Sequence, residues 1–567
     1  MSRPVRTRFY LGETFAVEHA PAENTFSGVA ALLLPPLGYE DTCAYRPLRV
    51  LADRLAARGH LVLRPDWPAH GDSAGEPLEI DQVALGQEAV ARAAAHLRAR
   101  GATRVAGFAV RAGGLLALAS EGLDDLALWA VPASGKAYLR EERAFHQMAA
   151  RAYGEAPPDA APPPEGALEA GGFLYGPRTV AAFSGLSTEA LAARGRWGRV
   201  LLLGRDGLAV PEGLPAAFSS NGAEVQAASP QGLADLLENA YKSELRPEVA
   251  ELIEAWLEPA RASAPVALRP VDLQGSLALP GGVREHPLML EGGAGELSGI
   301  LCEPEGGAPA GAPWTLFFNA GGIRRAGPNR LWTRAARALA RRGVPSLRFD
   351  VRDVGDSDGV EMPHADLEAM YSESAIADAL LAYDGLRARG AGAIDVVGLC
   401  SGSFLGVQTA DRRPVRRALL INCLAFVWND DARVSGVTSH IGSSLLDGRR
   451  WRRLLSGRIP AGRVMKALGA RAWMALKAPF QPRDGEDEVA ALLRRVSARG
   501  TELCLVSSEG DPSLPYLERH LPPEGRPPVT LLPGVDHTVR PVWAHRRVVG
   551  MVLGEPDDGA GDPGSDL

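Results

Sequence analysis

A pattern that occurs twice constrains this chain more than any other feature. The pattern occupies residues 30–73 and again residues 314–357. Each copy consists, in this order, of an apolar strand, a loop, a helix, a glycine, a second strand and the triplet Gly-Asp-Ser. After each copy come another helix and an apolar strand that ends in a glycine-rich turn. A repeat on this scale predicts two copies of one architecture. We interpret the triplets themselves, Gly71 to Ser73 and Gly355 to Ser357, as structural turns without chemistry.

The order of these elements predicts the fold class. Strands that alternate with helices indicate βαβ units and a mainly parallel sheet. The 567 residues are too many for one ordinary domain. We therefore expect two tandem, doubly wound α/β domains, each with an inserted lid segment. The predicted parts are a first domain (1–262), a linker (263–285), a second domain (286–556, lid at about 425–490) and a disordered tail (557–567).

The second domain carries a candidate nucleophile at a sharp turn. Residues 398–402 read Gly-Leu-Cys-Ser-Gly, with Cys400 at the centre. A strained strand-to-helix turn needs small residues on both sides so that the central side chain can project. An apolar strand precedes this turn and a helical run follows it, so the motif has the context that it requires. We predict Cys400 as the nucleophile, and not Ser401 or Ser403, which lie off the apex.

Two residues further along the chain, an aspartate and a histidine, complete a predicted triad with Cys400. In a fold with this turn, the acid and then the base follow the nucleophile along the chain. Asp511 and His537 each follow one of the next two predicted strands, so they reach the same sheet edge as Cys400. His537 would take the thiol proton and return it to the leaving group, while Asp511 would orient the imidazole. Glu509 is the alternative acid.

The same edge offers groups that stabilise charge. The backbone N–H of Ser401 and one from the loop 319–322, where glycines permit close approach, would form an oxyanion hole. We favour Gly321 for the second donor. A thiolate next to a protonated histidine and a helix N-terminus is expected to have a lowered pKa.

The first domain has no nucleophile at the equivalent turn. Residues 109–113 read Ala-Val-Arg-Ala-Gly. The apex is Arg111 if Gly113 closes the turn, or Ala109 in a shifted register. Neither side chain is a nucleophile.

The first domain also lacks a base. Asp206 follows a strong strand and could serve as the acid, but no histidine occurs between residues 146 and 286. The base position falls near residues 239–241, Asn-Ala-Tyr, where nothing relays a proton at neutral pH. We predict a non-catalytic first domain and favour a structural role over ligand binding.

Composition excludes several other classes of protein. A chain with 46% hydrophobic and 23% charged residues is globular, and a net charge of −7 gives no general attraction to nucleic acid. We find no signal peptide and no bilayer-spanning apolar run, and expect a cytoplasmic location. Five cysteines are too few for a disulfide scaffold, and no C-x-x-C pair indicates zinc. We predict no metal or cofactor. We expect His520 and His545 to lie on the surface, and four cysteines to be buried packing residues: Cys43, Cys302, Cys423 and Cys504.

These motifs resemble the α/β-hydrolase superfamily over almost the whole chain. The second half resembles a bacterial branch that includes hydrolases accompanying exosortase systems and stand-alone hydrolases of biosynthetic gene clusters. A cysteine at this turn is also similar to dienelactone hydrolase and to acyl-CoA amino-acid acyltransferases, and the motifs do not separate these branches. The resemblance rests on residues 319–321, 325–330, 347–350, 355–357, 398–402, 508–511 and 536–538.

The predicted lid of the second domain is strongly basic. Residues 433–483 contain eleven Arg or Lys and one acidic residue, Asp447, with apolar residues interleaved. This pattern is typical of amphipathic basic helices. Such a lid would dock an acidic partner: an acyl carrier protein's phosphopantetheine arm, a coenzyme A ester or an anionic membrane surface. An ordinary solvated face would show the same pattern. The predicted docking residues are Arg449, Arg450, Arg452 and Arg453.

We predict an acyl-transfer hydrolase that acts on ester or thioester carbonyls through an acyl-enzyme on Cys400. Two alternatives stay open. The acyl group could pass to an amine or alcohol, which would make the protein an acyltransferase. Alternatively, both halves could be degenerate, and the protein would bind partners through its basic lid.

Overall fold

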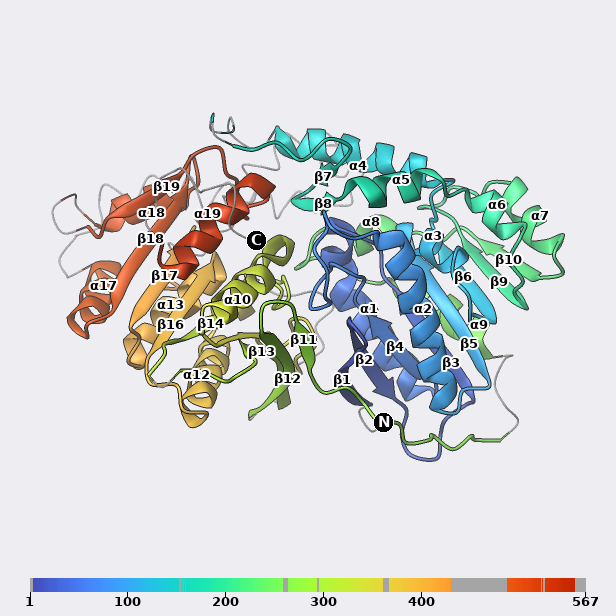
Figure 1. The fold of residues 1–567 in the computed structure, drawn as a ribbon, viewed down its shortest axis with the longest axis horizontal. Coiled ribbons are helices and arrows are strands. Elements are labelled where there is room, and N and C mark those ends of the chain that lie inside the picture. Colours follow the sequence, from blue (N-terminus) through green and yellow to red (C-terminus); the bar gives the residue numbers. More distant parts are fainter. Residues whose placement is uncertain are drawn as a thin grey trace.

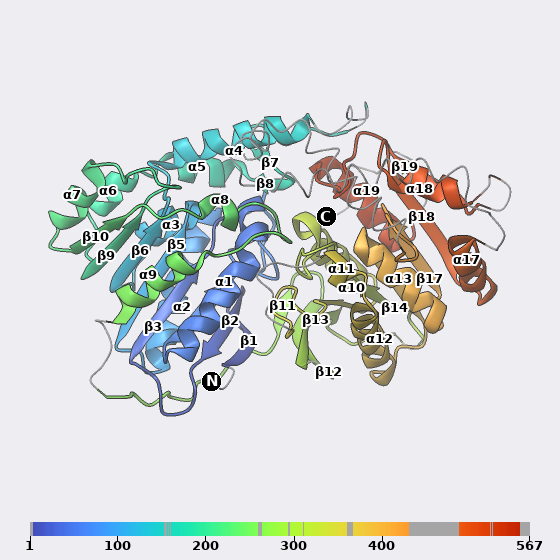
Figure 2. The ribbon, with the colours of Figure 1, turned by 180° about the vertical axis from the view of Figure 1, so that it is seen from behind.

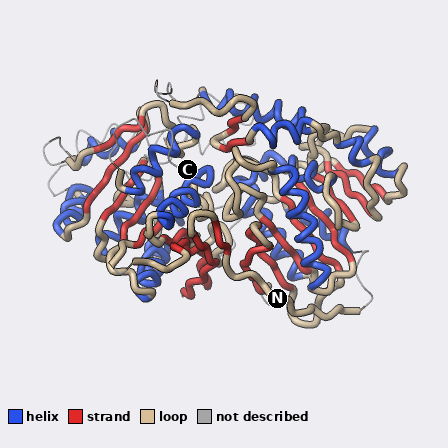
Figure 3. The backbone as a smooth tube through the Cα atoms, viewed as in Figure 1, coloured by secondary structure: helices blue, strands red, loops and turns tan. Residues whose placement is uncertain are grey.

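The computed structural model describes residues 4–151, 156, 158, 160–258, 264–292, 295–309, 311–359, 367–429, 487–521, 523 and 526–555. They form two halves that lie side by side, each with its own sheet (Figure 1). In both halves the strands lie between layers of helices (Figure 3). Among these residues, no helix is both long and apolar enough to cross a membrane.

The first half contains an eight-stranded sheet in the order β1-β2-β4-β3-β5-β6-β9-β10. β1 pairs antiparallel with β2, and β2 with β4, while the other neighbours are parallel. The strands are β1 (Val5–Leu11), β2 (Thr14–Ala20), β3 (Val29–Leu34), β4 (Leu61–Pro65), β5 (Arg104–Val110), β6 (Asp125–Trp129), β9 (Arg199–Leu203) and β10 (Glu224–Ala228).

The second half repeats this order. Its sheet runs β11-β12-β13-β15-β14-β16-β17-β18-β19, so that after one extra edge strand the sequence of neighbours is the same. The predicted fold class, two mainly parallel α/β-hydrolase-like domains, is confirmed. The strands are β11 (Leu277–Leu279), β12 (Val283–Gly292), β13 (Gly295–Pro304), β14 (Trp314–Phe317), β15 (Ser346–Phe349), β16 (Ile394–Leu399), β17 (Arg417–Ile421), β18 (Glu502–Ser508) and β19 (Val529–Leu532).

The second sheet begins earlier than the sequence indicated. β11 and the first residues of β12 lie within 263–285, which we assigned to a linker. β11 has only three residues, Leu-Ala-Leu, and pairs with β12 across a short turn. Three residues are too few to show the apolar–polar alternation that identifies a strand in a sequence. The strand is recognised only from its pairing with β12 in the structure.

Helices cover both faces of each sheet. In the first half they are α1 (Tyr39–Ala57), α2 (Gln82–Ala99), α3 (Ala112–Leu118), α7 (Gly213–Ser219), α8 (Leu233–Leu236) and α9 (Pro247–Leu257). Its inserted segment comprises α4 (Gly135–Ala150), the hairpin β7 (Leu168–Ala170) and β8 (Phe173–Tyr175), α5 (Pro177–Ser184) and α6 (Thr188–Ala192). The second half has η2 (Pro328–Arg330), α10 (Leu331–Arg341), α11 (Leu367–Met370), α12 (Glu373–Ala388), α13 (Ser401–Arg412), α17 (Glu488–Ala498), α18 (Ser513–His520) and α19 (Val542–Leu553).

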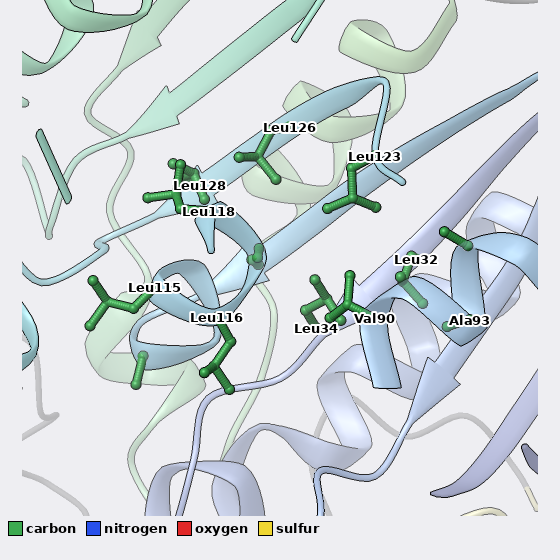
Figure 4. Close-up of a cluster of buried hydrophobic side chains, with 14 of the residues drawn as sticks. Leu32, Leu34, Val90, Ala93, Leu115, Leu116, Leu118, Leu123, Leu126 and Leu128 are labelled. Carbon is green, nitrogen blue, oxygen red and sulfur yellow. The ribbon is translucent and has the colours of Figure 1, made fainter. Parts of the chain in front are cut away.

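The central strands are apolar on both sides because both sides are covered. Successive residues of a strand point to opposite faces. In β3, Ala30, Leu32 and Leu34 therefore join the core beneath α2 and α3, while Val29, Ala31 and Leu33 join the core on the other face. Figure 4 shows Leu32 and Leu34 close to Val90 and Ala93 of α2. A continuous apolar run is the sequence signature of such a strand.

The two halves meet through their Gly-Asp-Ser turns. Arg348 of β15 donates to Asp72 of the first half at 3.1 Å, and Arg64 of the equivalent strand β4 donates to Asp356 of the second. Both aspartates are fully buried. The turns are structural, as predicted, and in addition each supplies a carboxylate to the other half.

Candidate functional site

Cys400 stands where β16 ends and α13 begins. Its backbone has φ 57° and ψ −118°, a region that residues other than glycine seldom occupy. The flanking glycines are needed because space is lacking: a Cβ on Gly398 would lie 2.2 Å from the carbonyl oxygen of Gly402, and one on Gly402 would lie 2.5 Å from that of Asn319. The strand-to-helix turn thus fixes the direction of the Cys400 side chain, which is half-buried at the margin of the core.

Asp511 and His537 meet at the same sheet edge. Asp511 follows β18, and His537 follows β19. Their contact is a 2.7 Å hydrogen bond between His537 Nδ1 and Asp511 Oδ2. Asp511 also accepts the backbone N–H of Ser513 at 2.9 Å, which fixes the carboxylate. Glu509, the alternative acid, is exposed.

Cys400 and His537 shift each other's pKa. Burial alone would raise the pKa of the Cys400 thiol, but the charge of the His537 imidazolium, together with hydrogen bonding from His537, Tyr371 and Ser401, lowers it. Burial would likewise lower the pKa of His537, but the charges of Cys400 and Asp511 hold it well above its usual value. Nδ1 of His537 is bonded to Asp511, which leaves the buried Nε2 as the ring nitrogen for proton exchange.

The other thiols behave differently. Burial raises the pKa of Cys43, Cys302, Cys423 and Cys504, and only the last of these is partly exposed. Of the five cysteines, Cys400 alone has a thiol pKa shifted downward.

The predicted oxyanion donors lie beside Cys400. The backbone N–H of Ser401 contributes to the lowered pKa of the Cys400 thiol. The N–H of Gly321, however, donates to the Ser401 hydroxyl at 2.9 Å. An oxyanion bound by Gly321 would therefore have to displace the Ser401 hydroxyl. Gly321 has φ +58°, which explains the glycine at this position.

Two further residues act on the site, and sequence reasoning missed both. The hydroxyl of Tyr371 lies 3.9 Å from Cys400 Sγ, and its ring stacks on Trp428 with centroids 4.2 Å apart. Asn422, directly after β17, donates to the carbonyl of His537 at 2.8 Å and to Ser508 Oγ at 2.9 Å, which holds the loop that carries His537. Neither residue belongs to a motif, and the position of Asn422 at a strand end was the one available signal.

The first half has an arginine at the turn where the second has Cys400. Arg111 has φ 52° and ψ −125°, nearly the same conformation as Cys400, and Ala109 lies within β5. The apex is therefore Arg111, the first of the two registers considered. Its guanidinium is neutralised by Glu40 at 3.0 Å and Glu141 at 2.5 Å. This ion-pair cluster occupies the place of a nucleophile.

Asp206 does not act as an acid for this turn. Its carboxylate accepts the backbone N–H groups of Gly232 and Leu233 at 3.0 and 2.9 Å, and so holds the start of α8. Asp206 thus caps a helix whose N-cap, Gly232, lies 26 residues further along the chain, and its position after a strand did not reveal this role.

The cluster around Arg111 gives a stability prediction. Glu142 on α4 is 5% exposed, and burial together with the charge of Glu40 raises its pKa to about 8. An unfolded glutamate titrates near 4.3, so stability falls as pH rises from about 4.3 through 8. Glu142→Gln should raise the free energy of unfolding at pH 8 by on the order of 2 kcal/mol and change it little at pH 4. Denaturant unfolding at both pH values measures this, and an equal gain at both would refute a protonation effect.

His545 is 3% exposed rather than on the surface, because α19 packs it inward, where its Nε2 lies 2.9 Å from the carbonyl of Val539. Burial lowers the pKa of His545 to about 3, so it is a neutral packing residue. The predicted docking residues, Arg449, Arg450, Arg452 and Arg453, lie outside the described residues, as does most of the predicted lid.

Comparisons with known proteins give distant similarities. No family model and no curated protein sequence matches this chain. Among solved structures, XC6422 from Xanthomonas campestris, an α/β serine hydrolase without a lid, is 17% identical with a TM-score of 0.29, and the match covers 50% of this chain and 97% of that one. An acetyl xylan esterase from Paenibacillus sp. R4 is 15% identical with a TM-score of 0.31, covering 49% and 87%. Est1E from Butyrivibrio proteoclasticus is 15% identical with a TM-score of 0.30, covering 46% and 98%.

Proposed function

We propose that the second half is an acyl-transfer hydrolase whose nucleophile is Cys400, with His537 as base and Asp511 as its orienting acid. The observation that carries this proposal is the arrangement of these three groups. A cysteine at a strained strand-to-helix turn has a lowered pKa through its interaction with His537, which is in turn hydrogen-bonded to Asp511. A nucleophile, a base and an orienting group in this order are the requirement for covalent acyl transfer.

The reaction follows from what each atom can do. The Cys400 thiolate, whose proton already lies on His537, bonds through Sγ to the carbonyl carbon of an ester or thioester. The carbonyl oxygen becomes an oxyanion, which the backbone N–H groups of Ser401 and Gly321 stabilise. His537 then gives the proton to the leaving alkoxide or thiolate, and an acyl-enzyme with a C–S bond remains.

Water completes the cycle in the hydrolase. His537 removes a proton from water as its oxygen attacks the acyl carbon, and the C–S bond breaks. The carboxylic acid leaves, and the thiolate–imidazolium pair is restored. An amine or alcohol in place of water would make the product an amide or ester, so hydrolase and acyltransferase differ only in this step.

A panel of short acyl esters and thioesters tests the proposal. The wild type should release the leaving alcohol or thiol and the free acid, and added hydroxylamine should divert part of the acyl group to a hydroxamate. The fraction diverted by amino acids or alcohols then separates transfer from hydrolysis. If no ester and no thioester of the panel were consumed, the result would favour the alternative, a binding protein without turnover.

The basic lid suggests a substrate carried on an acidic group. The sequence 433–483 has a net charge of about +10 inside an acidic protein. Replacing Arg449, Arg450, Arg452 and Arg453 with glutamine should raise KM for an acyl carrier protein or coenzyme A thioester several-fold, since electrostatic attraction speeds association. KM for a small neutral ester should change little. Equal effects on both substrates would contradict docking through these residues.

A further inference from the structure

The loop that follows β14 is held at both ends by contacts of different origin. This oxyanion loop, residues 319–323, contains Gly321 and Gly322 and precedes two consecutive arginines. On the side of the second half, the Asn319 side chain donates to Asp350 at 3.1 Å and to the carbonyl of Ile323 at 3.0 Å. The second half therefore fixes the start of the loop.

The first half holds the other end of the loop. Arg324 is 5% exposed, and all of its charged partners in the described chain belong to the first half. Asp66 lies 2.7 Å and Asp41 lies 3.0 Å from its guanidinium, which also stacks 3.8 Å from the centre of the Tyr45 ring. The next residue, Arg325, pairs with Asp72 of the first half at 2.9 Å and with Asp350 at 2.7 Å.

The first half also packs directly on the glycines. A Cβ added to Gly322 would lie 2.8 Å from the carbonyl oxygen of Ala240 and 3.0 Å from Tyr241 Cα. These are backbone atoms, so they cannot move away as a flexible side chain would. Tyr241 also packs against the core of the second half.

A second contact joins the first half to the loop of His537. Glu169 of the β7–β8 hairpin accepts the backbone N–H of Val542 at 3.1 Å, at the start of α19. The hairpin extends toward α19 both in Figure 1 and in Figure 2, which shows the molecule from behind.

We propose that the first half holds the oxyanion loop of the second half in position. Asp41, Asp66 and the Ala240–Tyr241 backbone form this clamp. This inference rests on the proposed function for its catalytic part. A glycine-containing loop has many accessible conformations, and oxyanion stabilisation requires its N–H groups to be in place before reaction. The clamp explains why a half without a nucleophile or a base stays joined to a half with both. Asp41, Asp66, Ala240 and Tyr241 are positioning residues and touch no reacting atom.

The test uses the full chain with two variants and a matched control. Asp41→Ala removes one carboxylate of the clamp and leaves Asp66 to neutralise Arg324. Gly322→Ala pushes against Ala240 and Tyr241 without changing any charge. The control, Asp125→Ala, removes a carboxylate that is 1% exposed in the same half and pairs with Arg104, away from the second half.

Three measurements separate positioning from loss of stability. Hydrogen exchange should become faster in a peptide covering 319–325 for both clamp variants, but not for the control. The kcat for a short thioester should fall about 10-fold or more for both, with KM changed less than about 3-fold. Alkylation of Cys400 by iodoacetamide should keep its wild-type rate, because that reaction forms no oxyanion.

Two results would overturn the inference. One is wild-type exchange of the loop in both clamp variants. The other is faster hydrogen exchange of the loop while kcat, calculated per molecule with a reactive Cys400, stays at the wild-type value. Failure of the proposed function looks different: if the wild type turned over no acyl substrate, faster loop exchange in both variants would still establish the clamp, and wild-type exchange would remove it.

Discussion

Replacing Cys400 with alanine is expected to lower kcat for a short acyl thioester by about 10⁴-fold or more. The reason is that alanine has no atom that can bond to the acyl carbon, so the covalent route is lost. The oxyanion donors and His537 remain, and these account for any residual rate. Steady-state release of the thiol leaving group measures the effect.

Two further variants serve as controls for this result. Cys504→Ala removes another partly exposed thiol and should leave kcat within about 2-fold, because Cys504 lies on β18 away from His537. Cys400→Ser should retain measurable turnover, since a hydroxyl can also be activated by a base. Turnover by Cys400→Ala at a rate close to that of the wild type would show that another group is the nucleophile.

Replacing His537 with alanine is expected to lower kcat by about 10⁴-fold and also to change the pH dependence of Cys400 reactivity. In the wild type the pKa of Cys400 lies below its ordinary value of about 8.5, so thiolate persists at lower pH. Without the imidazolium, burial dominates and raises this pKa. Alkylation by iodoacetamide at pH 7 should then fall on the order of 10-fold or more, and the midpoint of its pH profile should move upward.

The matched control for this variant is His545→Ala. His545 is buried and neutral, so its loss should affect stability and leave the pH profile of alkylation unchanged. A His537→Ala profile that coincides with the wild type would contradict the thiolate–imidazolium pair.

Much of the fold could be predicted because its signals are local. β3 and β14 begin within one residue of positions 30 and 314, where the two copies of the repeated pattern begin, and β16 leads directly into the predicted turn at Cys400. The glycines around Cys400 mark a tight turn in which Cys400 itself has a positive φ, and Arg111 has nearly the same conformation. Strand order then places Asp511 and His537 at one edge, since carboxyl ends of parallel strands share an edge.

The remaining features depend on contacts between residues far apart in the chain. Nothing around Asp66 or Asp72 shows that their partners are Arg324 and Arg348, because a buried ion pair leaves no periodicity in sequence. The role of Tyr371 likewise depends on a segment that returns to the site outside the strand-and-helix repeat. The capping role of Asp206 depends in the same way on a partner 27 residues along the chain, the backbone N–H of Leu233.

The most direct test of the central claim is the mass of the intact protein after mixing with an acetyl thioester and rapid acid quenching. The account predicts that the wild type gains the mass of one acetyl group, that proteolysis locates it on Cys400, and that Cys400→Ala gains nothing. No mass gain in the wild type while the thioester is consumed, or an equal gain in Cys400→Ala, would contradict an acyl-enzyme on Cys400.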